Sequence, residues 1–168
     1  MRILGIDPGY AIVGYGIVDY IGGKFSVVSY GAVTTEAHTH FPERLKSIYD
    51  DLNTIIETYK PDALAIEKLF FNTNTTTAID VAQARGVIVL SAQSNGLEIG
   101  EYTPLQIKQS VTGYGRAEKR QVMEMVKSLL SLKAVPKPDD TADALALAVC
   151  HGHYSGSSYS KVYKEIRK

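Results

Sequence analysis

Short apolar runs at the start of the chain alternate with turn-forming residues. Residues 2–7 are largely apolar and predict a buried strand that ends in a carboxylate, Asp7. Residues 13–20 and 25–33 are rich in Val, Ile and Tyr, and the glycine-containing segment 21–24 between them predicts a hairpin turn. The first part of the chain therefore predicts three consecutive strands.

The apolar spacing changes to that of a helix after residue 41. Residues 42–59 repeat apolar side chains every three or four positions, behind an N-terminal proline. The later predicted elements are strands at 63–67 and 98–103 and helices at 77–95, 104–111, 117–131 and 139–154. This order predicts an α/β fold with a mixed sheet, whose later strands are joined by helical crossovers.

The predicted helix 77–95 is apolar nearly all round. One side carries Ile79, Ala82, Gly86 and Leu90, and the opposite side carries Val81, Ala84, Ile88 and Ala92. Such a helix has to be covered on two sides, and the sheet can cover only one of them. Either a neighbouring helix or a second subunit has to cover the other.

Length and composition fit one ordinary globular domain. The 168 residues are 45% apolar and 21% charged, and we expect one domain over 1–155 with a short basic tail over 156–168. No apolar run is long enough to span a membrane, and Asp7 comes too early for a signal peptide. Because Cys150 is the only cysteine, no internal disulfide can form, and we expect a reduced, cytoplasmic protein.

The net charge is zero, but the charges are distributed unevenly. Residues 1–104 carry 7 basic and 12 acidic side chains, whereas residues 105–137 carry 7 basic and 2 acidic ones. This separation fits carboxylates that hold a metal and a basic segment that holds an anion. A solvated helix face with excess lysine explains the charge equally well.

Four carboxylates stand out by their position. Asp7 and Glu67 end two predicted strands, and Asp140 and Asp143 lie three residues apart on one helix face. Carboxylates gathered in one place repel each other unless a hard cation joins them, and Mg²⁺ prefers oxygen ligands. Two such ions about 3.5–4 Å apart can activate a water and stabilise the leaving oxygen in phosphodiester cleavage. Taken singly, Asp7 can be a turn residue, Glu67 a solvated strand end and Asp139 a helix N-cap.

The segment 7–10 (DPGY) also has a different interpretation. Together with 14–16 (GYG) it is similar to the first phosphate loop of actin-like ATPases and sugar kinases, where glycines let the backbone approach a nucleotide. Those proteins are much longer, and no second phosphate loop is evident in this sequence. The glycines can instead relieve a crowded strand beside the metal site, or let the backbone approach DNA.

A polar turn at 109–116 opens the predicted helix 117–131. We expect its backbone amides, with Gly113 and Gly115 in the turn, and the helix N-terminus to suit a phosphate. Four basic side chains surround the turn and add charge without base specificity: Lys108, Arg116, Lys119 and Arg120. The alternative is that Lys119 merely stabilises the helix surface.

Two phenylalanines, Phe70 and Phe71, precede a polar segment at 72–77. Beside the acidic residues, an exposed ring could stack on an unpaired base. One or both rings can instead turn inward as part of the core.

Five segments together resemble the RuvC family of Holliday junction resolvases. They are IDPGYAIVGYGIV (6–18), AIEKLFF (65–71), AQARGVIVL (82–90), GYGRAEKRQV (113–122) and PDDTADALALAVCH (138–151). They follow the order and spacing of the family and extend over nearly the whole chain. Asp-Pro-Gly alone would be a weak match, whereas the full set is highly specific.

The resemblance implies an RNase-H-like fold of the retroviral integrase superfamily, with a five-stranded mixed sheet flanked by helices. It also implies a homodimer that makes paired, Mg²⁺-dependent cuts in opposing strands of a four-way DNA junction. Two ions per active site, Mn²⁺ as a substitute metal, and the RuvA and RuvB branch-migration proteins as partners follow from the same resemblance.

The resemblance also assigns roles to individual residues. The family's acidic tetrad falls on Asp7, Glu67, Asp140 and Asp143, its lysines on Lys108 and Lys119, and its junction-contacting aromatic on Phe70. We expect Lys119 to stabilise charge on the reacting phosphate. A non-catalytic junction-binding protein that keeps the fold is the alternative from another functional class, and the complete tetrad argues against it.

Overall fold

The computed structural model describes residues 1–69 and 77–156. Its strands are β1 (Arg2–Asp7), β2 (Ile12–Ile21), β3 (Lys24–Thr34), β4 (Ala63–Glu67) and β5 (Glu98–Tyr102). Its helices are α1 (Phe41–Tyr59), α2 (Ala78–Ser94), α3 (Pro104–Thr112), α4 (Lys119–Leu129) and α5 (Asp139–Gly156). The types and order of the predicted elements are confirmed, and their ends differ by a few residues.

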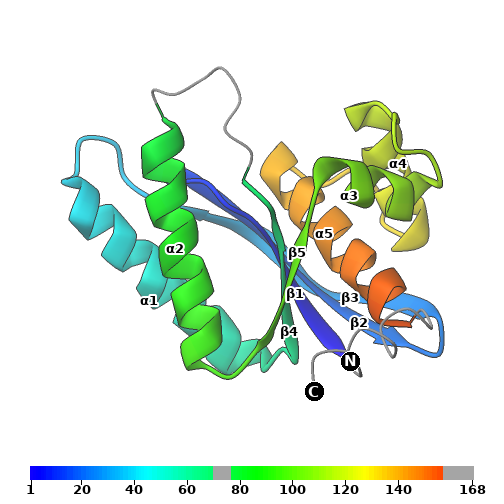
Figure 1. Cartoon of the computed structure of the whole chain (residues 1–168), viewed down its shortest axis with the longest axis horizontal. Helices are drawn as coiled ribbons and strands as arrows, with labels where there is room; N and C mark the ends of the chain where they lie inside the picture. The colour runs from blue at the N-terminus through cyan, green and yellow to red at the C-terminus, as the bar shows by residue number, and fades with distance from the viewer. Residues whose placement is uncertain (70–76, 157–168) are drawn as a thin grey trace.

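The five strands form one mixed sheet in the order β3-β2-β1-β4-β5. β1 and β3 are antiparallel to β2, whereas β1, β4 and β5 are parallel to one another. Figure 1 shows α1 and α2 on one side of the sheet and α3, α4 and α5 on the other. The predicted five-stranded mixed sheet flanked by helices, the RNase-H-like arrangement, is therefore confirmed.

Alternation along β1 and β4 decides which layer each side chain faces. Leu4 and Ile6 of β1 belong to the core under α1 and α2, whereas Ile3 belongs to the core under α5. In β4, Ala65 likewise belongs to the α5 side. Because successive side chains of a strand point to opposite faces, Asp7 and Glu67 project from the ends of these strands toward the α5 layer.

Glycines let α5 lie unusually close to the sheet. A Cβ added at Gly5 would lie 2.0 Å from the carbonyl oxygen of Ala144, and one added at Gly14 would lie 2.0 Å from that of Asp140. No side chain fits in these gaps, so the helix backbone rests directly on β1 and β2. The expectation that the glycines relieve a crowded strand is confirmed, and the crowding element is α5.

The two apolar stripes of α2 have different surroundings. Ala84, Ile88 and Ala92 are buried in the core beside the sheet. On the opposite side, Ile79 is 65% exposed and Leu90 is 61% exposed. The stripe with Ala84 and Ile88 therefore faces the sheet, and the stripe with Ile79 and Leu90 faces outward.

Two expectations about the ends of elements change in the structure. α4 begins at Lys119, because Glu118 is still extended and its amide donates to Gln121 Oε1 at 2.8 Å. Asp139 is the first residue of α5, and its carboxylate accepts a hydrogen bond from Lys137. The N-cap interpretation of Asp139 is therefore wrong, because the residue lies inside the helix and pairs with a lysine.

Within residues 1–69 and 77–156, no helix has both the length and the apolar character needed to cross a membrane. Most of the expected basic tail, from residue 157 on, lies outside the described residues.

Because α5 contacts the sheet directly, a single methyl group added at Gly5 should destabilise the folded protein strongly. Gly5→Ala should lower the free energy of unfolding by about 1–3 kcal/mol or more, because the new Cβ collides with helix backbone that cannot rotate away. Glu57→Ala is the control, since this exposed position of α1 should change the free energy of unfolding by less than about 0.5 kcal/mol. Urea unfolding measures both, and equal effects of the two variants would contradict the close approach of α5.

Candidate active site

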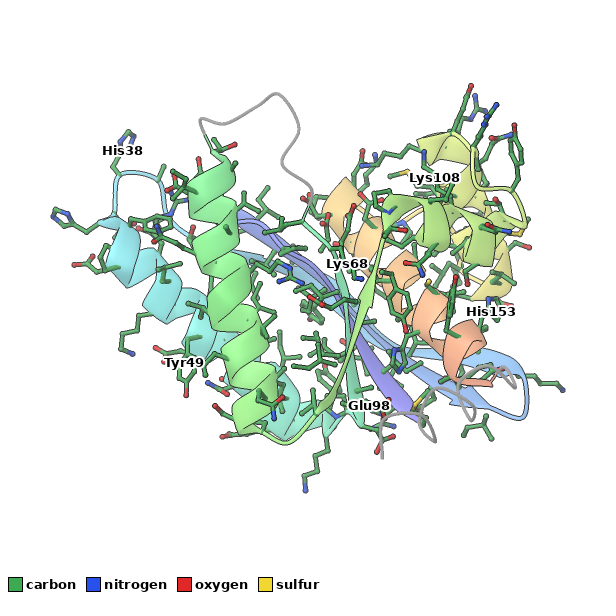
Figure 2. All side chains as sticks on the ribbon, in the orientation of Figure 1. His38, Tyr49, Lys68, Glu98, Lys108 and His153 are labelled. Carbon is green, nitrogen blue, oxygen red and sulfur yellow. The ribbon has the colours of Figure 1, made fainter. Side chains whose placement is uncertain are left out.

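Three carboxylates and two lysines surround one cavity at an edge of the sheet. Asp7 and Glu67 end the parallel neighbours β1 and β4, and parallel strands bring their carboxyl ends to the same edge. Asp143 of α5, Lys108 of α3 and Lys119 of α4 line the same cavity of about 290 Å³. Figure 2 shows Lys108 on α3, in the layer that also contains α4 and α5. Residues from five separate elements thus meet at one place.

Asp140 is near this cluster but is not among the residues that line the cavity. Its negative charge acts on Asp7, although less strongly than the charges of Asp143 and Glu67 do. Its backbone carbonyl rests against Gly14, at the first turn of α5. The structure therefore brings Asp7, Glu67 and Asp143 together and leaves Asp140 at the rim.

Burial and the charges of neighbouring acids raise the pKa values of Asp7 and Glu67. Burial, followed by the charges of Asp143, Glu67 and Asp140, raises the pKa of Asp7 to about 7, while Lys119 acts in the opposite direction. Burial, with a smaller contribution from Asp143, also raises the pKa of Glu67. The cavity therefore holds more negative charge than its surroundings compensate, which is the situation that a bound cation relieves.

Lys119 supplies part of the missing positive charge. Its Nζ lies 2.8 Å from Asp143 Oδ2 and 3.9 Å from Asp139 Oδ2. The hydrogen bond to Asp143, with the nearby charges of Asp139 and Asp7, raises the pKa of Lys119. The ammonium of Lys119 therefore offsets part of the negative charge of Asp143.

The donor chemistry of the cavity fits Mg²⁺, since carboxylate oxygens are the ligands that this ion prefers. Over residues 1–69 and 77–156, however, no three Asp, Glu, His or Cys side chains are grouped as closely as one ion requires. The carboxylates have to reorient before they can share an ion. The metal-ligand roles of Asp7, Glu67, Asp140 and Asp143 stay predictions.

The turn between α3 and α4 differs from its predicted role. The amides of Gly113, Tyr114, Ala117 and Glu118 all donate to acceptors within the chain. These four amides are therefore not available to a phosphate, and that part of the expectation is wrong. Gly113 ends α3 with φ of 76°, a conformation that favours glycine.

Other residues of this region are compatible with contact to an anion. Gly115 lies against Leu105, where a Cβ would meet that side chain at 2.6 Å. Arg116 and Arg120 are exposed, so their charges face solvent. DNA contacts by Gly113, Gly115, Arg116 and Arg120 stay predictions, and they depend on cationic side chains more than on amides. Phe70, the predicted stacking residue, lies outside the described residues.

Sequence reasoning missed one side chain next to the acidic cluster. Arg85 of α2 donates from Nε to the backbone carbonyl of Glu67 at 3.1 Å and pairs with Glu101 of β5. Arg85 is the only basic residue in the largely apolar α2. That isolation in an apolar helix is the signal by which the sequence could have revealed it.

The sequence and the fold match one family throughout. The sequence model of the family "Crossover junction endodeoxyribonuclease RuvC" matches residues 3–151. The chain belongs to the RuvC family. A RuvC of Alkaliphilus metalliredigens is 63% identical over 153 residues, which cover 91% of this chain and 93% of that protein. A RuvC of Clostridioides difficile is 60% identical over 166 residues, 99% of this chain and 97% of that protein.

Solved structures agree with the assignment to the RuvC family. The structure described as "T. thermophilus RuvC in complex with Holliday junction substrate" has a TM-score of 0.88 and 34% sequence identity, and covers 92% of this chain and 94% of that chain. The ATPase interpretation of the first glycines is therefore wrong. Gly14 and Gly16 make room for α5, since a Cβ at Gly16 would lie 2.6 Å from Leu145.

The raised pKa of Asp7 predicts that replacing this residue increases the free energy of unfolding by an amount that depends on pH. The folded protein binds this proton more tightly than the unfolded chain, so metal-free wild type loses stability as pH rises from Asp7's ordinary value of 3.8 to about 7. Asp7→Asn should remove that loss. The free energy of unfolding of Asp7→Asn, relative to wild type, should increase by at most about 1.4 kcal/mol per pH unit across this pH range. Above this range the difference should stay constant.

Urea unfolding in the presence of a chelator, at pH 5, 6, 7 and 8, measures this difference. Asp51→Asn, which removes an exposed carboxylate of α1, is the reference variant. An advantage of Asp7→Asn that is constant with pH, or that grows toward acid, would contradict the buried and crowded state of Asp7.

Proposed function

We propose that this protein is a Mg²⁺-dependent endonuclease that resolves four-way (Holliday) DNA junctions by paired cuts in opposing strands during recombination and repair. The observation that carries the proposal is the cavity in which Asp7, Glu67, Asp143, Lys108 and Lys119 meet. Its acids suit a cation and its lysines suit a phosphate. Membership of the RuvC family, and the Holliday junction bound by the RuvC of Thermus thermophilus, support this substrate.

Asp7, Glu67 and Asp143 are the residues that would hold the metal, with Asp140 joining from the first turn of α5. Mg²⁺ held there supplies activation of a water and stabilisation of charge on the phosphodiester. Two ions per site and substitution by Mn²⁺ follow the family resemblance and stay predictions.

The side chains of the cavity have separate tasks. The apolar residues Ile107, Val122 and Leu147 form part of its wall and limit the water around the carboxylates. Lys119, exposed over 56% of its side chain, can exchange Asp143 for a non-bridging phosphate oxygen and so stabilise the charge that develops there. Lys108 is half-buried, lines the same cavity and suits a phosphate of the DNA strand.

Paired cuts require two active sites, and the outward face of α2 suits a second copy of the chain. Ile79 and Leu90 are mostly exposed there, and a Cβ at Gly86 between them meets open space. Apolar side chains aligned on the outside of a helix are typical of an interface. A twofold dimer through this stripe would present two equal sites to a junction of near-twofold symmetry.

Cooperation with RuvA and RuvB and a cytoplasmic location accompany this proposal as predictions. The basic residues Arg116 and Arg120 would contact the backbone of the junction arms, and Phe70 would contact its unpaired bases.

The proposal predicts cleavage of a synthetic four-way junction with Mg²⁺ and none with a chelator. Asp7→Asn and Glu67→Gln should lower the cleavage rate by more than the roughly 10- to 100-fold that loss of an outer-shell partner causes. Junction affinity should stay the same or increase, because the removed charge repels phosphate. Gel-shift and cleavage assays on the same junction separate the two effects.

Asp51→Asn is the control and should cleave like wild type, because this exposed acid of α1 is not part of the cavity. Wild type that binds the junction and never cuts it would favour a non-catalytic junction-binding protein. Variants at Asp7 or Glu67 that lose affinity together with cleavage would point to a structural role for these acids.

The dimer predicts opposite outcomes for two neighbouring residues of α2. Leu90→Glu should give a folded monomer, because the charge lies on the outward stripe, whereas Ile88→Glu should unfold the protein, because Ile88 is fully buried. Met125→Glu places the same charge on an exposed side chain of α4, in the other layer, and should stay dimeric. Sedimentation and circular dichroism measure the outcome, and a dimeric Leu90→Glu would place the interface elsewhere.

A further inference from the structure

Arg85 reaches the active-site strand from the layer opposite the active site. It lies on α2, whereas the carboxylates of the cavity project toward α5. Its Nε donates to the carbonyl oxygen of Glu67 at 3.1 Å, and its terminal nitrogen pairs with Glu101 of β5. The side chain of Arg85 is only 16% exposed. One guanidinium therefore joins three elements at the point where β4 ends.

The position of this contact gives it a direct bearing on the carboxylate of Glu67. Glu67 is the last residue of β4, and Lys68 follows it with an amide that donates to the carbonyl of Tyr102 at 2.8 Å. The peptide between Glu67 and Lys68 is thus held on one side by β5 and on the other by Arg85. The orientation of that peptide fixes the backbone from which the Glu67 side chain projects.

We propose that Arg85 is a positioning residue for Glu67, which fixes the backbone from which this carboxylate projects into the cavity. The proposal rests on the proposed nuclease function. A guanidinium is suited to the task, because its planar fork can bind a carbonyl and a carboxylate at once, while remaining charged. Glu101 of β5 holds the guanidinium of Arg85 in place. In the sheet, Glu101 pairs with Ile66 of β4, the residue before Glu67.

The first consequence concerns metal affinity. A carboxylate whose backbone is free to shift binds an ion less well, and loss of such an outer partner typically costs about 10- to 100-fold in metal affinity or activity. Arg85→Met should therefore raise the Mg²⁺ concentration at half-maximal cleavage by about 10-fold or more. Its affinity for the junction without metal should stay within about twofold of wild type, because Arg85 makes no contact with the cavity.

A readout without catalysis separates this role from activity. Mn²⁺ titration of the DNA-free protein, followed by the shift in melting temperature, should show saturation at higher Mn²⁺ for Arg85→Met than for wild type. Arg85→Lys should recover part of the loss, since an ammonium can bind the carbonyl or the carboxylate but lacks the fork. Glu101→Gln should show a smaller form of the same shift.

Arg2→Met is the matched control. Arg2 is the first residue of β1, at the end of the strand away from Asp7. Like Arg85, it binds one carboxylate, that of Asp19, and one backbone carbonyl, that of Tyr59. Its loss should lower the melting temperature without changing the Mg²⁺ or Mn²⁺ dependence. If Arg85→Met and Arg2→Met lose stability alike and both keep the metal dependence of wild type, Arg85 has only a structural role and the proposal is overturned.

The remaining outcomes are also decisive. If Arg85→Met does not fold, Arg85→Lys and Glu101→Gln carry the test, and unchanged metal dependence in both contradicts the proposal. Failure of wild type to cut the junction with Mg²⁺ would instead contradict the proposed function. The altered Mn²⁺ titration of Arg85→Met would still be expected in that case, so the two failures can be told apart.

Discussion

The direct contact of α5 with β1 and β2 is the constraint on which the active site depends. Side chains normally separate a helix from a sheet, but at Gly5 and Gly14 there is room for none. The helix backbone takes that space, and Asp143 thereby reaches the cavity that Asp7 and Glu67 form at the strand ends. A larger residue at either glycine would move α5 outward and separate the acid on the helix from the two acids on the strands.

The same close packing gathers negative charges that the surrounding residues compensate only in part. Three acids share a small, partly buried cavity, and the pKa of Asp7 rises to about 7 as a consequence. Lys119 offsets this charge from the side of α4 through its contact with Asp143. The surrounding core can hold such a cluster because Ile6 and Ile66, one residue before each strand-end acid, are fully buried on the opposite face. Both faces of the sheet carry a buried core, and the acids lie at the strand ends on the face that α5 covers.

Sequence patterns were sufficient for the sheet and for the two strand-end acids, because Asp7 and Glu67 follow short apolar runs whose order requires parallel neighbours. They could not orient the helices. The spacing of Asp140 and Asp143 predicts one shared face, yet only Asp143 lines the cavity, because the rotation of α5 is set by the contact of the Asp140 carbonyl with Gly14. The turn after α3 illustrates a second limit, since a glycine-rich pattern does not reveal that the amides of Gly113 and Tyr114 already have acceptors.

The apolar composition of α2 follows from the different surroundings of its faces. Ala84 and Ile88 pack on the sheet, Arg85 donates a hydrogen bond to the carbonyl of Glu67 at the end of β4, and Leu90 faces outward. From sequence the two apolar stripes are equivalent, because periodicity measures amphipathicity and both faces of this helix are apolar. Only the packed structure shows which of the two stripes faces the sheet. The single basic residue in such a helix then stands out for a physical reason: a charge that is mostly buried has to be paired, and Arg85 is paired with the strand that carries Glu67 and with its neighbour.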